Sequence, residues 1–93
     1  MPANQQWVLY HYPSCPYCQI VRRVASELGV ELELRDIHAD PAFLRELVAA
    51  TGRRTVPCLR IPGEGPEGDD RWMHESMDII EWLEKRLGAD RGA

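Results

Sequence analysis

The segment Pro13-Ser14-Cys15-Pro16-Tyr17-Cys18 constrains the fold of this chain most, because it places two cysteines one helical turn apart between two regular elements. The residues before it, 7–12, are mainly aromatic and aliphatic, which is typical of a β-strand. After it, apolar residues recur at helical spacing: Cys18, Val21, Ala25, Leu28. Proline is tolerated in the first turn of a helix, where its missing N–H is not needed. The sequence therefore predicts a strand, a turn carrying Cys15, and a helix that ends at Gly29.

The rest of the chain continues this alternation of strand and helix. Residues 30–37 alternate apolar and polar side chains, and Asp40-Pro41 predicts the start of a helix that ends at Gly52. The remaining predicted elements are strands at 55–61 and 71–73, a loop at 62–70, and a helix at 77–87 ended by Gly88. Strands joined by a helix are expected to be parallel, and the last two strands to form a hairpin. The order β-α-β-α-β-β-α resembles a thioredoxin-like α/β fold, with a four-stranded mixed sheet and three helices.

Length and charge narrow the class further. Ninety-three residues predict one domain, 1–93. The net charge is −4 and no basic stripe is present, so we expect no nucleic-acid partner. No apolar run approaches the roughly 20 residues that span a bilayer, so we expect no membrane partner. Residues 1–6 lack the basic and apolar regions of a signal peptide, which predicts a cytoplasmic protein.

The two close cysteines predict thiol chemistry. A helix N-terminus favours negative charge, so Cys15 is expected to be the attacking thiolate. Cys18 shares the core-facing side of the helix, and is therefore expected to be the more buried, resolving thiol. Half of a zinc site is the alternative, but zinc takes four ligands and the other candidates are scattered: Cys58, His11, His38, His74. We therefore expect no metal.

These motifs resemble known families. Cys15-Pro16-Tyr17-Cys18 resembles the active site of dithiol glutaredoxins, and Thr55-Val56-Pro57 is similar to that family's Thr-Val-Pro segment. Residues 74–80 resemble the Glu-Ser turn of glutathione transferase N-terminal domains through Glu75 and Ser76. The resemblance covers residues 6–87. It implies a glutathione-dependent thiol–disulfide oxidoreductase, a monomer that reduces glutathionylated or disulfide-bonded proteins with glutathione as the reductant.

The resemblance also implies which residues act. They are the redox pair and six glutathione contacts: Cys15, Cys18, Tyr17, Arg53, Val56, Pro57, Glu75, Ser76. Pro57 would be cis, and the backbone of Val56 would pair with the cysteinyl part of glutathione. Glu75 and Ser76 would hold its γ-glutamyl end at a helix N-terminus, although Ser76 could instead be a simple N-cap. Arg53, or its neighbour Arg54, would face the glycine carboxylate.

The chain departs from the glutaredoxin pattern in several places. Tyr12 stands where a lysine is common, Met73-His74 replaces a Gly-Gly pair, the loop at 62–70 is long, and Cys58 directly follows Pro57. Two alternatives therefore stay open. One is a redoxin of the same fold that takes electrons from a thioredoxin reductase. The other is a binding protein in which two Cys15 thiolates and glutathione hold an iron–sulfur cluster between two copies.

Overall fold

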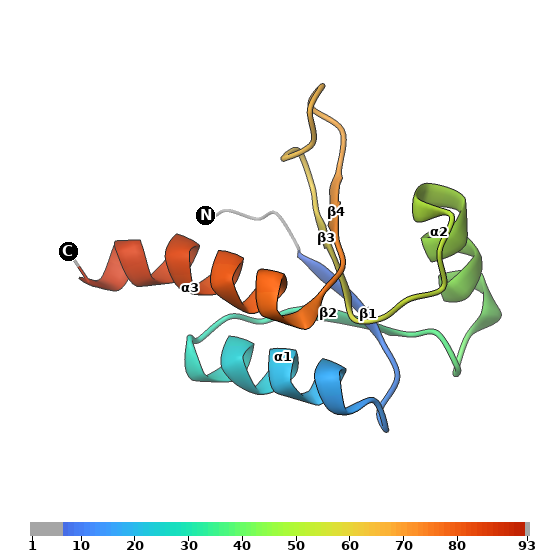
Figure 1. Ribbon diagram of the computed structural model, residues 1–93, viewed down its shortest axis with the longest axis horizontal. Coiled ribbons are helices and arrows are strands. Elements are labelled where there is room, and N and C mark those ends of the chain that lie inside the picture. Colours follow the sequence, from blue (N-terminus) through green and yellow to red (C-terminus); the bar gives the residue numbers. More distant parts are fainter. Residues whose placement is uncertain (1–6, 93) are drawn as a thin grey trace.

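The computed structural model describes the backbone of residues 7–92 and the side chains of residues 7–86. Within that part of the chain the elements are β1 (Val8–His11), α1 (Pro16–Glu27), β2 (Glu33–Asp36), α2 (Pro41–Thr51), β3 (Cys58–Ile61), β4 (Arg71–Met73) and α3 (Ser76–Gly92) (Figure 1). They form one sheet with strand order β2-β1-β3-β4. β1 and β2 are parallel, whereas β3 is antiparallel to both of its neighbours. The predicted fold class, with its crossover and its hairpin, is confirmed.

The helices cover the two faces of the sheet unequally. α1 and α3 pack side by side on one face and α2 covers the other (Figure 1). The core divides in the same way, because side chains alternate along a strand. Leu9, Leu59 and Ile61 join the cluster under α1 and α3, while Tyr10 and Cys58 join the cluster under α2. Within the described residues, no helix is long and apolar enough to cross a membrane.

Local signals fix most of the helix ends. The Asp40 carboxylate accepts a hydrogen bond from the N–H of Ala42 at 2.9 Å and caps α2, as predicted. Gly29 and Gly52 adopt left-handed conformations, with φ of 79° and 72°, where α1 and α2 end. Gly88 was expected to end the last helix, but α3 continues through it to Gly92. A glycine allows the left-handed turn without imposing it. Leu87, predicted for the apolar side of this helix, has a side chain outside the described residues.

The strands are shorter than the sequence pattern predicts. β2 begins at Glu33 instead of Val30, and β3 begins at Cys58 instead of Thr55. Each of these strands pairs with β1, whose four residues run only from Val8 to His11. Pairing therefore stops where β1 stops, although the alternating pattern of side chains extends further.

A partly buried polar network ties α2 to the sheet. The Tyr10 hydroxyl donates to Glu46 on α2 at 2.8 Å, and Arg35 on β2 donates to the same carboxylate at 2.6 Å. Arg35 also reaches the Tyr10 hydroxyl at 3.2 Å. Tyr10 itself is fully buried, so its hydroxyl depends on these partners. The network fixes α2 and, with it, the segment that leads from α2 back into the sheet.

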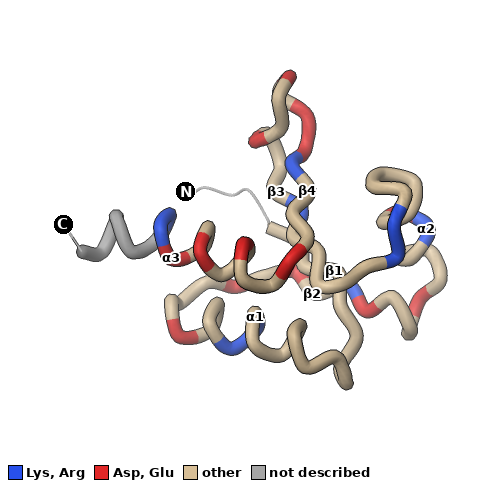
Figure 2. Tube along the Cα trace, in the orientation of Figure 1, with Lys and Arg blue, Asp and Glu red and all other residues tan. Residues whose placement is uncertain are grey.

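The loop 62–70 and α3 carry half of the acidic side chains in the described part of the chain (Figure 2). Two ion pairs hold the loop: Arg60 binds Asp70 at 2.6 Å, and Arg86 on α3 binds Glu64 at 3.3 Å. The guanidinium of Arg60 also lies over the ring of Trp72, 5.0 Å from its centroid. The long loop is therefore anchored on β3 and on α3.

Candidate active site

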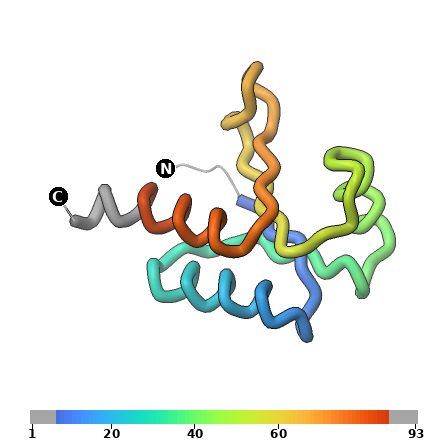
Figure 3. The backbone as a smooth tube through the Cα atoms, viewed as in Figure 1, coloured from blue at the N-terminus to red at the C-terminus, as the bar shows by residue number. Residues whose placement is uncertain are grey.

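The sheet register brings three separate segments to one edge of the molecule. β1 ends at His11, opposite the start of β3, because Tyr10 pairs with Cys58. β4 ends next to the same place, because Met73 pairs with Leu59. The turn before α1, the segment before β3 and the turn before α3 therefore meet at this edge (Figure 3). The residues predicted to be functional come from these three segments.

Cys15 caps the N-terminus of α1. Its backbone is extended, with φ −77° and ψ 115°, and its sulfur accepts a hydrogen bond from the N–H of Cys18 at 3.3 Å. Its own N–H donates to the carbonyl of Tyr12 at 3.1 Å, which closes the turn after β1. This is the position of a capping side chain, where unpaired backbone N–H groups and the helix dipole stabilise an anion. The sulfur of Cys15 is therefore placed at the positive end of the dipole of α1.

Cys18 lies one turn further along α1 and faces the core. It is completely buried, whereas 4% of Cys15 is exposed, so the predicted order of burial is confirmed. Burial, followed by the hydrogen bond with Cys15, raises the pKa of Cys18 to about 12. Cys18 is thus a neutral thiol near pH 7. The three cysteines of the chain carry free thiols.

The segment before β3 carries the predicted cis proline. The Val56–Pro57 peptide bond is cis, and Pro57 is buried at the base of the strand. Pro57 precedes β3 and does not belong to it, so its missing N–H removes no hydrogen bond from the sheet. Val56 is half-buried against the core cluster under α2.

The turn before α3 has an unusual backbone. Glu75 adopts a left-handed conformation with φ of 69°, which residues other than glycine rarely take. Its carbonyl accepts the N–H of Ile79 at 3.1 Å, so Glu75 occupies the cap position and Ser76 is the first residue of α3. Ser76 is therefore not the N-cap considered from the sequence. It lies among the free N–H groups of the first helical turn, which form an anion-binding position.

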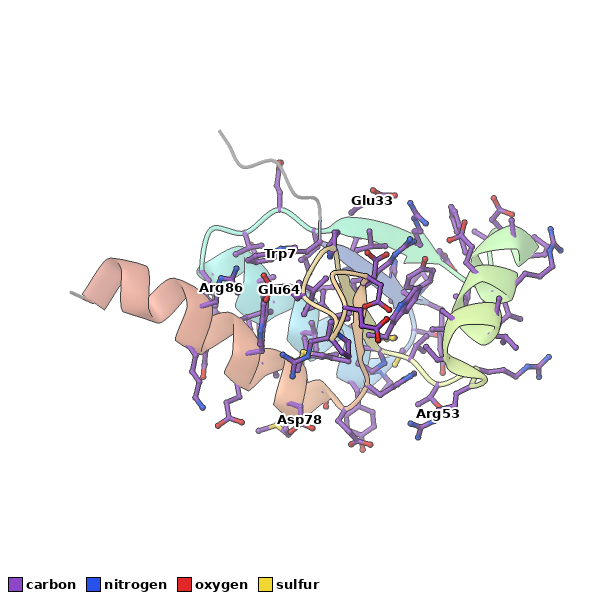
Figure 4. All side chains as sticks on the ribbon, turned by 90° about the horizontal axis from the view of Figure 1, so that it is seen from above. Trp7, Glu33, Arg53, Glu64, Asp78 and Arg86 are labelled. Carbon is purple, nitrogen blue, oxygen red and sulfur yellow. The ribbon has the colours of Figure 1, made fainter. Side chains whose placement is uncertain are left out.

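The structure separates the two adjacent arginines. Burial lowers the pKa of His74, and the nearby positive charge of Arg53 lowers it further. Burial raises the pKa of Cys58 to about 12 against an opposing effect of Arg53. Arg53 therefore lies on the side of His74 and Cys58. Figure 4 shows Arg53 at the same edge of the molecule as Asp78 of α3. Arg54 instead lines a groove along α2 with Leu44, Arg45, Val48 and Ala49.

Two contacts at this edge were not found by sequence reasoning. The Nε2 atom of His74 lies 3.9 Å from the sulfur of Cys58, which joins the end of β4 to the start of β3. Tyr12, at the position where a lysine was expected, stacks on His38 with ring centroids 4.2 Å apart. Both contacts join residues far apart in the chain. The one sequence signal for either contact was the position of His74, a polar residue directly after the predicted strand at 71–73. Within the described part, no cluster of three or more His, Cys, Asp or Glu side chains could hold a metal ion.

The chain is similar to two groups of known proteins. Residues 9–91 match the family described as glutathione S-transferase, N-terminal domain. Curated relatives include chloroplastic glutaredoxin-C4 of Oryza sativa subsp. japonica, 33% identical over 87% of this chain and 65% of that protein. Glutaredoxin 2 of Escherichia coli K12 is 32% identical, over 86% of this chain and 34% of its own length. A glutaredoxin of Vernicia fordii is 30% identical, over 87% of this chain and 83% of its own.

Solved structures agree with this fold. The maleylacetoacetate isomerase of Anaeromyxobacter dehalogenans 2CP-1, with bound dicarboxyethyl glutathione, has a TM-score of 0.63 and 27% identity, covering 91% of this chain and 39% of that one. The glutathione transferase Omega 2S of Trametes versicolor has a TM-score of 0.70 and 20% identity, covering 94% and 38%. At that identity the likeness concerns the fold alone. The chain spans little more than a third of these structures and of E. coli glutaredoxin 2.

Proposed function

The chain belongs to the glutathione S-transferase N-terminal domain family, with glutaredoxins among its relatives, and we propose that it is a glutathione-dependent thiol–disulfide oxidoreductase with Cys15 as the nucleophile. The observation that carries this proposal is the position of Cys15. Its sulfur caps α1 and accepts the N–H of Cys18 at 3.3 Å. A glutathione transferase domain can bind glutathione without a cysteine pair. A cysteine pair with one thiol at the cap position favours redox chemistry over transfer.

The proposed reaction removes glutathione from a protein thiol. The Cys15 thiolate attacks the glutathione sulfur of the mixed disulfide, the S–S bond breaks, and the target leaves as a thiolate that takes a proton from water. Cys15 is then disulfide-bonded to glutathione. The thiolate of a second glutathione attacks the glutathione sulfur of this bond, which releases glutathione disulfide and restores the Cys15 thiolate. One target cysteine is returned to its thiol form, and the two glutathione units leave joined by one disulfide.

A protein disulfide would follow a second route. Cys15 attacks one sulfur and forms a mixed disulfide with the target, releasing one target thiol. Cys18 gives up its proton and attacks the sulfur of Cys15, which releases the second target thiol and leaves a Cys15–Cys18 disulfide. Two glutathione molecules then reduce this bond and leave as glutathione disulfide. This route depends on the resolving thiol, whereas the first does not.

Glutathione is proposed to lie along the edge where the three segments meet. The backbone of Val56, beside Pro57, would pair with its cysteinyl unit in the manner of an added strand. The first turn of α3, at Glu75 and Ser76, would hold the γ-glutamyl carboxylate among its free N–H groups. Arg53 would face the glycine carboxylate, since it lies on this side and Arg54 does not. Tyr17 projects beside Cys15, where it would cover the bound tripeptide.

A coupled assay tests the proposal. Purified protein is mixed with the disulfide of cysteine and glutathione, reduced glutathione, glutathione reductase and NADPH, and the loss of NADPH is followed. We expect turnover by the wild-type chain and none by Cys15→Ser. Arg53→Ala should raise the KM for glutathione, while Arg54→Ala serves as its control. Inactivity of the wild-type chain with glutathione would overturn the proposal, and activity with NADPH and a thioredoxin reductase would then identify the electron donor.

A further inference from the structure

Two large apolar side chains stand exposed in the first turns of α1 and α3. The exposed fraction is 62% for Tyr17 in the first turn of α1 and 71% for Met77 in the first turn of α3. The other large apolar side chains on the surface of the described chain have exposed fractions of only 38–42%. α1 and α3 pack side by side and begin at the same end of the molecule (Figure 1). The two most exposed large apolar groups therefore belong to the helix turns at the end of the molecule where α1, capped by Cys15, begins.

The surface on the α1 side is apolar and uncharged. Ile20, 39% exposed, follows Tyr17 by three residues and so lies on the same side of the helix. No residue from 12 to 21 carries a charge, and the first charged side chain of α1 is Arg22 (Figure 2). An exposed apolar strip beside a reactive group is typical of a surface that another molecule covers.

The surface on the α3 side is acidic. Exposed carboxylates precede and follow Met77 in the chain: Glu75 at the cap position, and Asp78 and Glu81 in the first two turns of the helix. The first basic residue of α3 is Lys85, which pairs with Glu81 at 3.6 Å (Figure 2). Figure 4 shows Asp78 projecting from the edge of the molecule, away from the sheet. A partner that covers Met77 therefore meets a negative potential, which favours basic side chains and opposes acidic ones.

We propose that Tyr17, Ile20 and Met77 form a docking surface for the target polypeptide, whose modified cysteine is flanked by an apolar residue and by basic residues. This inference rests on the proposed function and names its substrate class. Glutathione is proposed to contact Tyr17, Val56 and the backbone of Ser76, so the polypeptide end of the mixed disulfide extends past Tyr17 over the exposed side chains of Ile20 and Met77. The apolar neighbour of the cysteine contacts the apolar side chains, and the basic residues face the carboxylates of α3.

Three substrates separate the docking surface from the chemistry. The first is a glutathionylated peptide with leucine next to the cysteine and two arginines beyond it. The second is the same peptide with the arginines replaced by glutamates, and the third is the small disulfide of cysteine and glutathione. We expect the wild-type chain to turn over the arginine peptide at least about tenfold better, in kcat/KM, than the glutamate peptide, with a difference that shrinks as salt is raised.

Two variants test the residues on which this inference depends, and a third is a control. Met77→Gln keeps the length of the side chain and should lower kcat/KM for the arginine peptide about fivefold while leaving the small disulfide unchanged. Leu34→Gln, on the distant edge strand β2 with the side chain 42% exposed, is the matched control and should change neither rate. Asp78→Asn should reduce the preference for the arginine peptide. Equal rates on both peptides, or a Met77→Gln loss that is the same on the small disulfide, would overturn the inference. Failure of the wild-type chain on the small disulfide would instead overturn the proposed function.

Discussion

Cys18→Ser should leave the removal of glutathione from small mixed disulfides nearly intact and should abolish the reduction of protein disulfides when no glutathione is present. The reason is the state of the Cys18 thiol, whose pKa is raised to about 12 by burial first and then by the hydrogen bond with Cys15. At pH 7 a thiol of pKa 9.0 is about 1% ionised, and one of pKa 12 about 0.001%. The nucleophilic form of Cys18 is thus about a thousandfold scarcer than that of an unperturbed cysteine.

This scarcity decides which thiol attacks the mixed disulfide of Cys15 with glutathione. The Cys15 charge disappears when the mixed disulfide forms, but burial, the larger cause, stays. Free glutathione at millimolar concentration should therefore compete successfully with Cys18, and Cys18→Ser should change kcat/KM for the small disulfide by less than about twofold. Without glutathione, by contrast, Cys18 is the thiol that attacks the mixed disulfide of Cys15 with a protein target and releases the target.

The pH profile gives an independent measurement. Single-turnover reduction of a protein disulfide, without glutathione, depends on ionised Cys18 and should rise about tenfold per pH unit between pH 7 and 9. Cys58→Ser removes another fully buried thiol and is the matched control, which should leave this profile unchanged. A plateau near pH 8, or a loss of more than tenfold by Cys18→Ser on the small disulfide, would refute the reasoning.

Three further predictions concern stability. In the folded state the pKa values of Cys18 and Cys58 are raised from 9.0 to about 12. The stability that their neutral thiols contribute is therefore fully present below pH 9 and should be lost between pH 9 and 12. In urea titrations, the free energy of unfolding of Cys58→Ala should fall less over this pH range than that of the wild-type chain. Asp40→Ala removes the cap on the N–H of Ala42 and should cost about 1 kcal/mol in urea unfolding, whereas Asp40→Asn should cost less; equal losses would contradict a capping role. Tyr10→Phe should cost about 1 kcal/mol by deleting the hydroxyl bond to Glu46, and an unchanged midpoint would mean that water replaces it.

The ends of α2 were predictable because their causes are local. Asp40 caps α2 with its own side chain, and Gly52 ends that helix in a left-handed conformation. The strand ends were less predictable, because the length of a strand depends on its partner. Thr55 and Val56 have side chains suited to a strand, yet β3 starts only at Cys58, where pairing with β1 begins.

The candidate site likewise has features that the sequence predicts and features that it does not. The cap position of Cys15 and the burial of Cys18 follow from their spacing at the start of one helix. The choice between Arg53 and Arg54 does not, because two adjacent residues after a helix can face either side of the chain. The contact of His74 with Cys58 requires the register of β3 and β4, which brings together residues 16 positions apart.

The sequence by itself determined the order of the elements, the helix that begins at Cys15 and the burial of the resolving thiol, because these depend on spacing within a few residues. Only the tertiary structure decided which arginine lies with His74, the left-handed turn at Glu75, and the exposure of Met77 in the first turn of α3. These features depend on how the sheet register and the packing of α1 against α3 place distant segments, and no local pattern encodes those distances.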